Sequence, residues 1–129
     1  MRKIILALSF AIGLTACASL QNDWNVLTST QVTITTVAVA GNTFDALEAT
    51  ATAYLRLPRC GSTSGAVCRD PAASKKIISA VRAGRVARNN LEQFFVDHPG
   101  QLGPQGLYDA LQASIATLQG VIATYNIKG

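Results

Sequence analysis

The chain has 129 residues, of which 49% are hydrophobic, 6% are aromatic and 14% are charged, and its formal net charge is +4. This length supports one domain with a modest core, and apolar residues that are mostly alanine, valine, leucine and isoleucine favour closely packed helices. The sequence has no G-x-S-x-G motif, no phosphate-binding glycine loop and no histidine and glutamate spacing for a metal. It therefore gives no support to the common hydrolase, nucleotide-binding and metalloenzyme classes.

The N-terminus has the three-part layout of a secretory signal peptide. Arg2 and Lys3 precede the uncharged run IILALSFAIGL, and small residues follow from Thr15 to Ala18. A run of eleven residues at about 1.5 Å each is too short to cross roughly 30 Å of hydrocarbon. We therefore expect this segment to direct export rather than to form a permanent transmembrane helix.

Four residues at the cleavage region, Leu14-Thr15-Ala16-Cys17, resemble the lipobox of bacterial lipoproteins. The resemblance implies a signal peptide over residues 1–16, a diacylglycerol on the Cys17 thiol, cleavage before Cys17 and acylation of its new amine. Formation of the thioether requires a thiolate nucleophile. A residue that carries more than one acyl chain anchors a protein stably in a membrane. Ala18 in place of aspartate implies the periplasmic face of the outer membrane, by analogy with sorting in enteric-type bacteria.

An ordinary signal peptidase site is the alternative interpretation of the same residues. Cleavage after Ala18, at Ala16-Cys17-Ala18, would release a soluble periplasmic or secreted protein. On the lipoprotein interpretation, residues 17–28 are the lipidated N-terminus and tether, and residues 29–129 are the bundle domain. Trp24 would then rest in the membrane interface or pack against the bundle.

The first helix is expected after possible cap residues at Ser29 to Gln31. Its proposed buried face has members spaced alternately by four and three residues, namely Thr33, Val37, Ala40, Phe44, Leu47, Ala51 and Tyr54. The segment from Gln31 to Ala40 is ambiguous, because it also alternates with period two and is rich in β-branched residues. No second strand pattern is available to pair with it, so we favour a continuous helix, frayed or kinked near Gly41 and ended by Arg56 to Pro58.

Cys60 and Cys68 flank a loop rich in glycine and serine, GSTSGAV. Export places both thiols in an oxidising compartment, so we predict a disulfide that joins the ends of the loop between the first two helices. A metal site or redox pair is the weaker interpretation, because the spacing is not C-x-x-C and no histidine is near.

The second helix is predicted from about Ala72 to Asp97, with Asp70 as N-cap and Pro71 at the first helical position. Helical periodicity gives it one buried face, made of Ala73, Ile77, Ala80, Val81, Gly84, Ala87, Leu91, Phe94 and Phe95. The third helix begins near Pro104, and its predicted buried face comprises Leu107, Leu111, Ile115, Leu118, Ile122 and Tyr125. Three amphipathic segments with short connections predict an all-α, three-helix, up-down-up bundle.

Cations are concentrated in one part of the chain. Residues 56–88 contain eight Lys or Arg and one acid, Asp70. The outer side of the second helix mixes these cations with apolar residues, and its members are Lys75, Ile78, Arg82, Arg85, Val86 and Asn89. Arg88 lies at the edge of the apolar side, within reach of Glu92 one turn later.

This mixture makes Ile78, Arg82, Arg85 and Val86 a candidate partner-binding surface, because arginine beside exposed aliphatic side chains is common in interfaces. Its charge suits an acidic envelope protein or an anionic polymer. Nucleic acid does not fit, because an exported chain rarely meets DNA. The alternative is a solvated helix face whose arginines pair with acids of neighbouring helices, Asp45, Glu48 or Asp109.

Catalysis has little support in the sequence, and we predict no catalytic residue, metal site or cofactor. His98 is the sole histidine, and Asp97-His98 is more typical of a helix end than of an acid–base pair. We expect a lipid-anchored cell-envelope protein that acts as a binding or structural module. The other hypotheses are a prophage-type accessory lipoprotein that inhibits a receptor or lysis factor, and a soluble exported helical protein.

Overall fold

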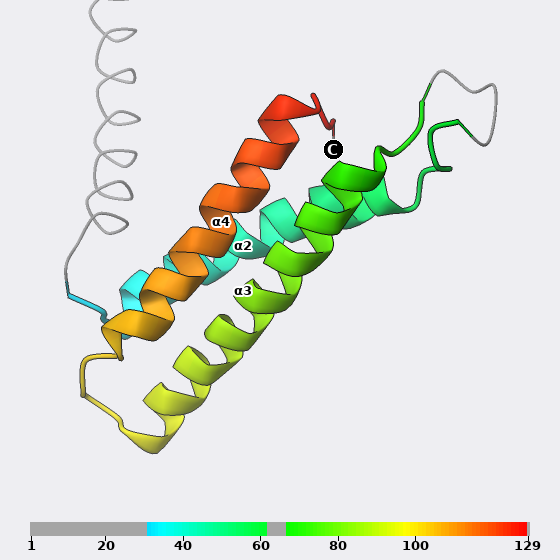
Figure 1. Cartoon of the computed structure of the whole chain (residues 1–129). Helices are drawn as coiled ribbons and strands as arrows, with labels where there is room; N and C mark the ends of the chain where they lie inside the picture. Colours follow the sequence, from blue (N-terminus) through cyan, green and yellow to red (C-terminus); the bar gives the residue numbers. More distant parts are fainter. Residues whose placement is uncertain (1–30, 62–66, 129) are drawn as a thin grey trace, which may run out of the picture.

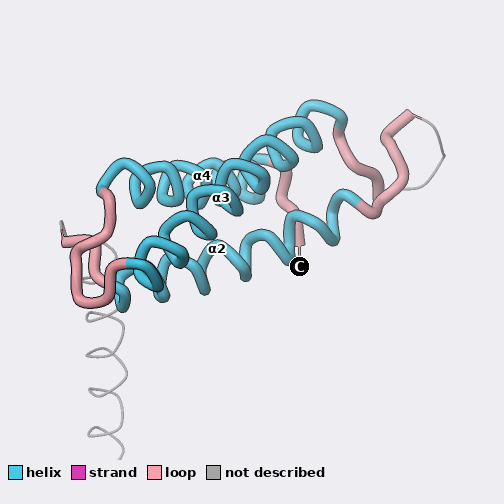
Figure 2. The backbone as a smooth tube through the Cα atoms, turned by 90° about the horizontal axis from the view of Figure 1, so that it is seen from below, coloured by secondary structure: helices cyan, strands magenta, loops and turns pink. Residues whose placement is uncertain are grey.

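The protein is a bundle of three antiparallel helices, seen in a computed structural model that describes residues 31–61 and 67–128. The helices are α2 (Ile34–Leu55), α3 (Pro71–Asp97) and α4 (Gln105–Thr124), and the described residues contain no strand. In Figure 1, α3 and α4 run beside each other and α2 crosses behind them. Figure 2 shows α2 in a layer of its own against the other two helices. The predicted all-α, up-down-up, three-helix bundle is confirmed.

Helix α2 resolves the ambiguity of its N-terminal half in favour of a helix, which continues through Gly41. The apolar side chains of this half occupy helical positions in the core, where Val37, Ala40 and Phe44 are buried. Packing against two neighbouring helices thus stabilises the helix more than the β-branched residues favour a strand, because their intrinsic preference for strands is weak.

The predicted cap of α2 is wrong, because the N-cap is Thr33 and not a residue from Ser29 to Gln31. The backbone of Thr33 is extended, and its Oγ1 accepts a hydrogen bond from the Thr36 backbone N–H at 3.1 Å. This bond satisfies one of the free donors of the first turn. Thr33 therefore caps the helix and is not a member of the buried face that we predicted for it.

Helix α3 starts as its sequence indicates. Asp70 is the N-cap, and its Oδ1 accepts hydrogen bonds from the backbone N–H groups of Ala72 at 2.8 Å and Ala73 at 3.0 Å. Pro71 occupies the first helical position, where its missing N–H costs nothing. Of the nine residues predicted to be buried, only Phe94 is half-exposed.

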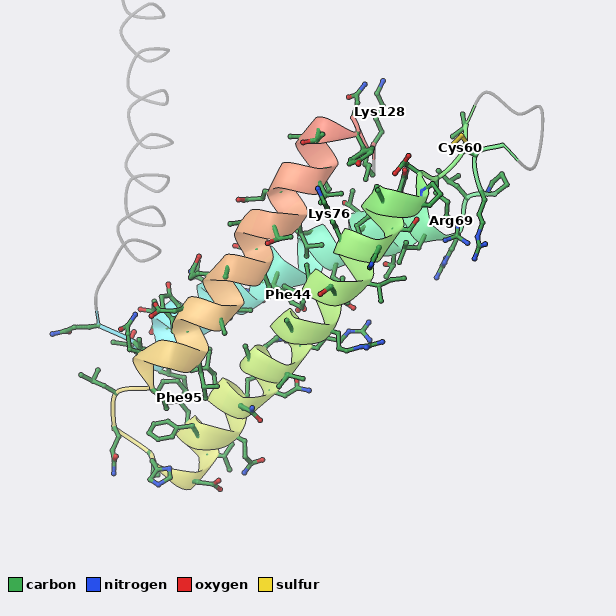
Figure 3. The ribbon with its side chains drawn as sticks, viewed as in Figure 1. Phe44, Cys60, Arg69, Lys76, Phe95 and Lys128 are labelled. Atoms are coloured by element: carbon green, nitrogen blue, oxygen red, sulfur yellow. A yellow bond between two sulfur atoms is a disulfide. The ribbon has the colours of Figure 1, made fainter. Side chains whose placement is uncertain are left out.

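A glycine lets α2 and α3 approach each other at the centre of the core. The ring of Phe44 is completely buried and rests against Gly84. A Cβ at Gly84 would lie 2.5 Å from Phe44 Cζ and 2.9 Å from Cδ2, which is closer than real carbon contacts allow. The small residue is therefore what makes room for the largest fully buried side chain; Phe44 is labelled in Figure 3.

Helix α4 buries a broader face than the sequence predicted. The predicted residues Leu111, Ile115 and Leu118 are buried, but Leu107, Ile122 and Tyr125 near the two ends are only half-buried. Residues at the margins of the face are buried instead, and these are Tyr108, Ser114 and Val121. The reason is that α4 packs against both α2 and α3, so its contact arc is wider than one row of apolar residues.

The predicted disulfide between Cys60 and Cys68 is confirmed, with the two Cα atoms 4.9 Å apart. Hydrogen bonds hold the same two chain segments together, because Cys60 N–H donates to the Arg69 carbonyl and Arg69 N–H donates to the Pro58 carbonyl. The Tyr54 hydroxyl, at the end of α2, accepts from the Asp70 backbone N–H at 2.6 Å. The disulfide therefore reinforces a connection that also fixes the start of α3.

Candidate partner-binding surface

Two arginines of α3 pair with acids rather than standing free. Arg85 donates to Glu48 of α2, with a distance of 2.8 Å from Nε to Oε1. Arg88 contacts Asp45 of α2 at 2.6 Å and Glu92 of its own helix at 2.9 Å. The hydrogen bond that Arg85 donates to Glu48, together with the negative charge of Glu48, raises the pKa of the Arg85 guanidinium.

These ion pairs separate Arg85 from the other members of the predicted surface, since its side chain is directed to α2. The alternative interpretation, that arginines pair with acids on neighbouring helices, describes Arg85 and Arg88 well. It does not extend to Asp109, whose Oδ1 accepts a hydrogen bond from Gln105 at 2.8 Å.

The remaining three residues, Ile78, Arg82 and Val86, lie together along a groove between α3 and α4. One part of the groove has a volume of about 600 Å³ and is lined by Lys75, Ile78, Ser79, Arg82, Ala83, Val86, Ala87, Leu107 and Ala110. A second part of about 440 Å³ is lined by Lys76, Ser79, Ala80, Ala83, Ala110, Ala113, Ser114 and Thr117. Because the two parts share Ser79, Ala83 and Ala110, they form one continuous depression, which we call the α3–α4 groove.

Short side chains form the floor of the α3–α4 groove, and larger apolar ones rise at its edges. Ser79 and Ala83 of α3 face Ala110 of α4 across the floor. The side chains of Ile78 and Val86 are 45% and 56% exposed. The result is an open apolar surface on the outer side of α3.

The α3 edge of this groove is cationic and the α4 edge is uncharged. Lys75, Lys76 and Arg82 are exposed, and no carboxylate within 31–61 or 67–128 forms an ion pair with them. Figure 3 shows Lys76 between α3 and α4. The lining residues of α4 are apolar or carry a hydroxyl group. The groove therefore combines apolar contact with positive charge along one side only.

Three residues of the predicted surface, Ile78, Arg82 and Val86, lie on the α3 side of this groove, and no residue of its α4 side was predicted to take part. The missed residues are Leu107, Ala110, Ala113, Ser114 and Thr117. Their signal is weak, because exposed alanine and threonine are ordinary on a helix surface. Only the packing of α4 against α3 brings Leu107 and Ala110 to the part of the groove that contains Arg82, and Ala113, Ser114 and Thr117 to the part that contains Lys76.

The other acidic residues and the histidine that the sequence raised as candidates each have a structural partner. His98 stacks on the Phe94 ring with centroids 4.5 Å apart, and Asp97 accepts a hydrogen bond from Gln93. Asp45 and Glu48 each contact an arginine. Across residues 31–61 and 67–128, no three potential ligands of the His, Cys, Asp or Glu type gather around a common point.

A smaller apolar hollow of about 280 Å³ lies where α2 begins and α3 ends. Ile34 and Val96 at its edges are 64% and 74% exposed, and Phe95 lines it. Nothing in the sequence predicted this hollow. The segment that resembles a lipobox, with Cys17, and Trp24 precede the hollow in the chain and lie outside the described residues.

Comparison of the chain with protein-family models, with curated proteins and with solved structures finds no match. Among the helices that the structure describes, none combines the length and the hydropathy needed to cross a membrane.

Proposed function

We propose that this protein is a lipid-anchored component of the bacterial cell envelope and that it binds a partner through the α3–α4 groove. The observation that carries the proposal is the contrast among the arginines of α3. Arg85 and Arg88 are held by acids of α2, whereas Arg82 stands exposed beside Ile78 and Val86. An exposed arginine flanked by aliphatic side chains is typical of a binding surface. Without a partner, these aliphatic side chains are exposed to water, which is unfavourable.

The anchor in this proposal is the Cys17 thioether, which rests on the resemblance of Leu14-Thr15-Ala16-Cys17 to a lipobox. Between Cys17 and Gln31 the chain can extend by at most about 3.5 Å per residue, or roughly 50 Å. The bundle would thus remain near the membrane with freedom to reach a partner there. We place it on the periplasmic side of the outer membrane.

The test of the anchor is the Cys17→Ala variant, expressed from the full-length gene. We expect loss of labelled palmitate incorporation, loss of processing and a shift from the membrane to the soluble fraction. Cys60→Ser/Cys68→Ser is the matched control, because it removes two cysteines and keeps Cys17. A Cys17→Ala variant that is processed and fractionates like the unmodified chain would refute the lipid anchor.

The test of the binding surface is crosslinking in intact cells from position Val86, replaced by an aliphatic amino acid that carries a diazirine. Arg82→Glu should weaken the crosslink, because it reverses the charge of the groove edge. Lys128→Glu is the matched control, because it makes the same charge change beyond the end of α4, outside the groove. Absence of any crosslinked product at Val86 would refute the proposed binding surface.

A further inference from the structure

We infer that the α3–α4 groove binds an acidic amphipathic helix of another protein. This inference rests on the proposed function and specifies the chemistry of the partner. The length of the groove, the position of its apolar side chains and the spacing of its cations support this inference.

The shape of the α3–α4 groove suits a helix. It follows α3 from Lys75 to Ala87, which corresponds to about 18 Å of helix at roughly 1.5 Å per residue. The side chains of Ser79, Ala83 and Ala110 on the floor are short, so a helix of the partner can approach α3 and α4 at the usual distance of about 8–10 Å between helix axes. A helix bound there would lie opposite α2 and complete a four-helix arrangement.

The apolar side chains of the groove match one face of such a helix. Ile78 and Val86 lie eight residues apart on α3, and Leu107 lies across from Val86 at the start of α4. An amphipathic helix presents apolar side chains at positions i, i+3 or i+4, and i+7, which is the recurring pattern for a helix in a groove. Binding would remove Ile78 and Val86 from water.

The cations fix the charge of the partner and its distribution. Lys75 and Arg82 are seven residues apart, or about 10.5 Å along the helix, in the same part of the groove. Lys76 adds a third positive charge in the second part of the groove. Two carboxylates one heptad apart on the partner would face Lys75 and Arg82. The lining residues of α4 carry no charge that could pair with an acid. The acids of the partner should therefore lie only on the side of the bound helix that faces α3.

A second copy of this chain is a poor occupant of the groove. None of its helices offers two carboxylates seven residues apart, because α2 has Asp45 and Glu48, α3 has Glu92 and Asp97, and α4 has Asp109 alone. Three of these five acids are already in ion pairs with Arg85 or Arg88. Two copies that met through α3 would bring like charges together. An anionic glycan is also a poorer fit, because it has no row of apolar groups to cover Ile78 and Val86.

The experiment maps the photocrosslink from Val86 to a residue of the captured molecule, in cells that express the full lipidated chain. We expect the crosslinked peptide to come from another protein and to carry acids seven residues apart beside apolar residues at helical spacing. Arg82→Glu should reduce the crosslink at least tenfold, and Lys128→Glu should leave it unchanged. Replacing the mapped acid of the partner with lysine should restore the crosslink to the Arg82→Glu variant.

The outcomes separate this inference from the proposed function. No crosslink from Val86 in any variant overturns both. A crosslink to a glycan, to a second copy or to a segment without acids overturns the acidic-helix inference alone, and so does failure of the charge exchange to restore binding. Circular dichroism of Arg82→Glu checks the fold, which should be unchanged because Arg82 is exposed and forms no ion pair within the described residues.

Discussion

Replacing Gly84 with alanine should destabilise the bundle, although alanine is the better helix former. In the interior of a helix, glycine to alanine is favourable by about 1 kcal/mol. At this position the new methyl group would lie 2.5 Å from Phe44 Cζ. The ring cannot withdraw into solvent, because Phe44 is completely buried.

The size of the effect follows from these two opposing contributions. Overpacking a close-packed core costs about 1–3 kcal/mol, and contact with several atoms of a rigid ring places this substitution at the upper end. After subtraction of the gain in helix propensity, we expect a net loss of about 1–2 kcal/mol in the free energy of unfolding. For a domain of this size, the thermal midpoint should fall by roughly 4–16 °C.

The assay is urea unfolding followed by far-ultraviolet circular dichroism, on purified protein that carries Cys17→Ala and an intact disulfide. Gly120→Ala is the matched control, because Gly120 is exposed on α4 and a Cβ there meets nothing within 4 Å. It should stabilise the protein by up to about 1 kcal/mol. Phe44→Leu should cost less in the Gly84→Ala background than alone, since it removes the clash. If Gly84→Ala proves as stable as the unmodified protein, the close contact between α2 and α3 is refuted.

Two further predictions concern the disulfide and a buried tyrosine. Cys60→Ser/Cys68→Ser should lower the free energy of unfolding by up to about 2.5 kcal/mol, because the bridge closes a short loop in the unfolded chain; dithiothreitol should do the same to the unmodified protein and nothing to the variant. Equal urea midpoints with and without the bridge would contradict this. Burial raises the pKa of Tyr108, and this effect is larger than that of the hydrogen bond from Gln112, which lowers the pKa. The folded chain therefore keeps the phenol proton at a pH where the unfolded chain has lost it, so this contribution to stability is full below about pH 10 and declines as the pH rises towards the folded pKa. Tyr108→Phe should show a smaller decline in urea midpoint between pH 9 and pH 11, and an identical decline would exclude Tyr108 as its source.

Local sequence signals predicted α3 better than its neighbours. Asp70-Pro71 defines its start through a side-chain cap and a proline, and both act within a few residues. The cap of α2 was missed because several hydroxyl residues precede that helix, and only the backbone conformation at Thr33 selects among them. The sequence indicated the small residue Gly84, but not that Phe44 would be its partner.

The same limit applies to the candidate surface. Helical periodicity gives the angle of each side chain about its own axis, so Arg82 and Arg85 were both placed on the outer side of α3. Whether an arginine meets an acid depends on how the next helix is rotated and offset, and periodicity does not contain that information. Glu48 of α2 lies beside Arg85, whereas the helix beside the groove at Arg82 offers alanine and leucine.

The position of the charges along the bundle affects how the proposed anchor and the proposed groove would act together. The chain enters the bundle at the start of α2, beside the end of α3, where Val32 accepts a hydrogen bond from Gly103. Asp97 and Asp109 lie near that end of their helices, while Lys75 lies about 33 Å from Asp97 along α3 at roughly 1.5 Å per residue. This separation is several times the Debye length of about 8 Å at physiological ionic strength. With the tether end towards the membrane, lipid headgroups would therefore not neutralise the lysine end of the groove, and its charge would remain available to an acidic protein partner.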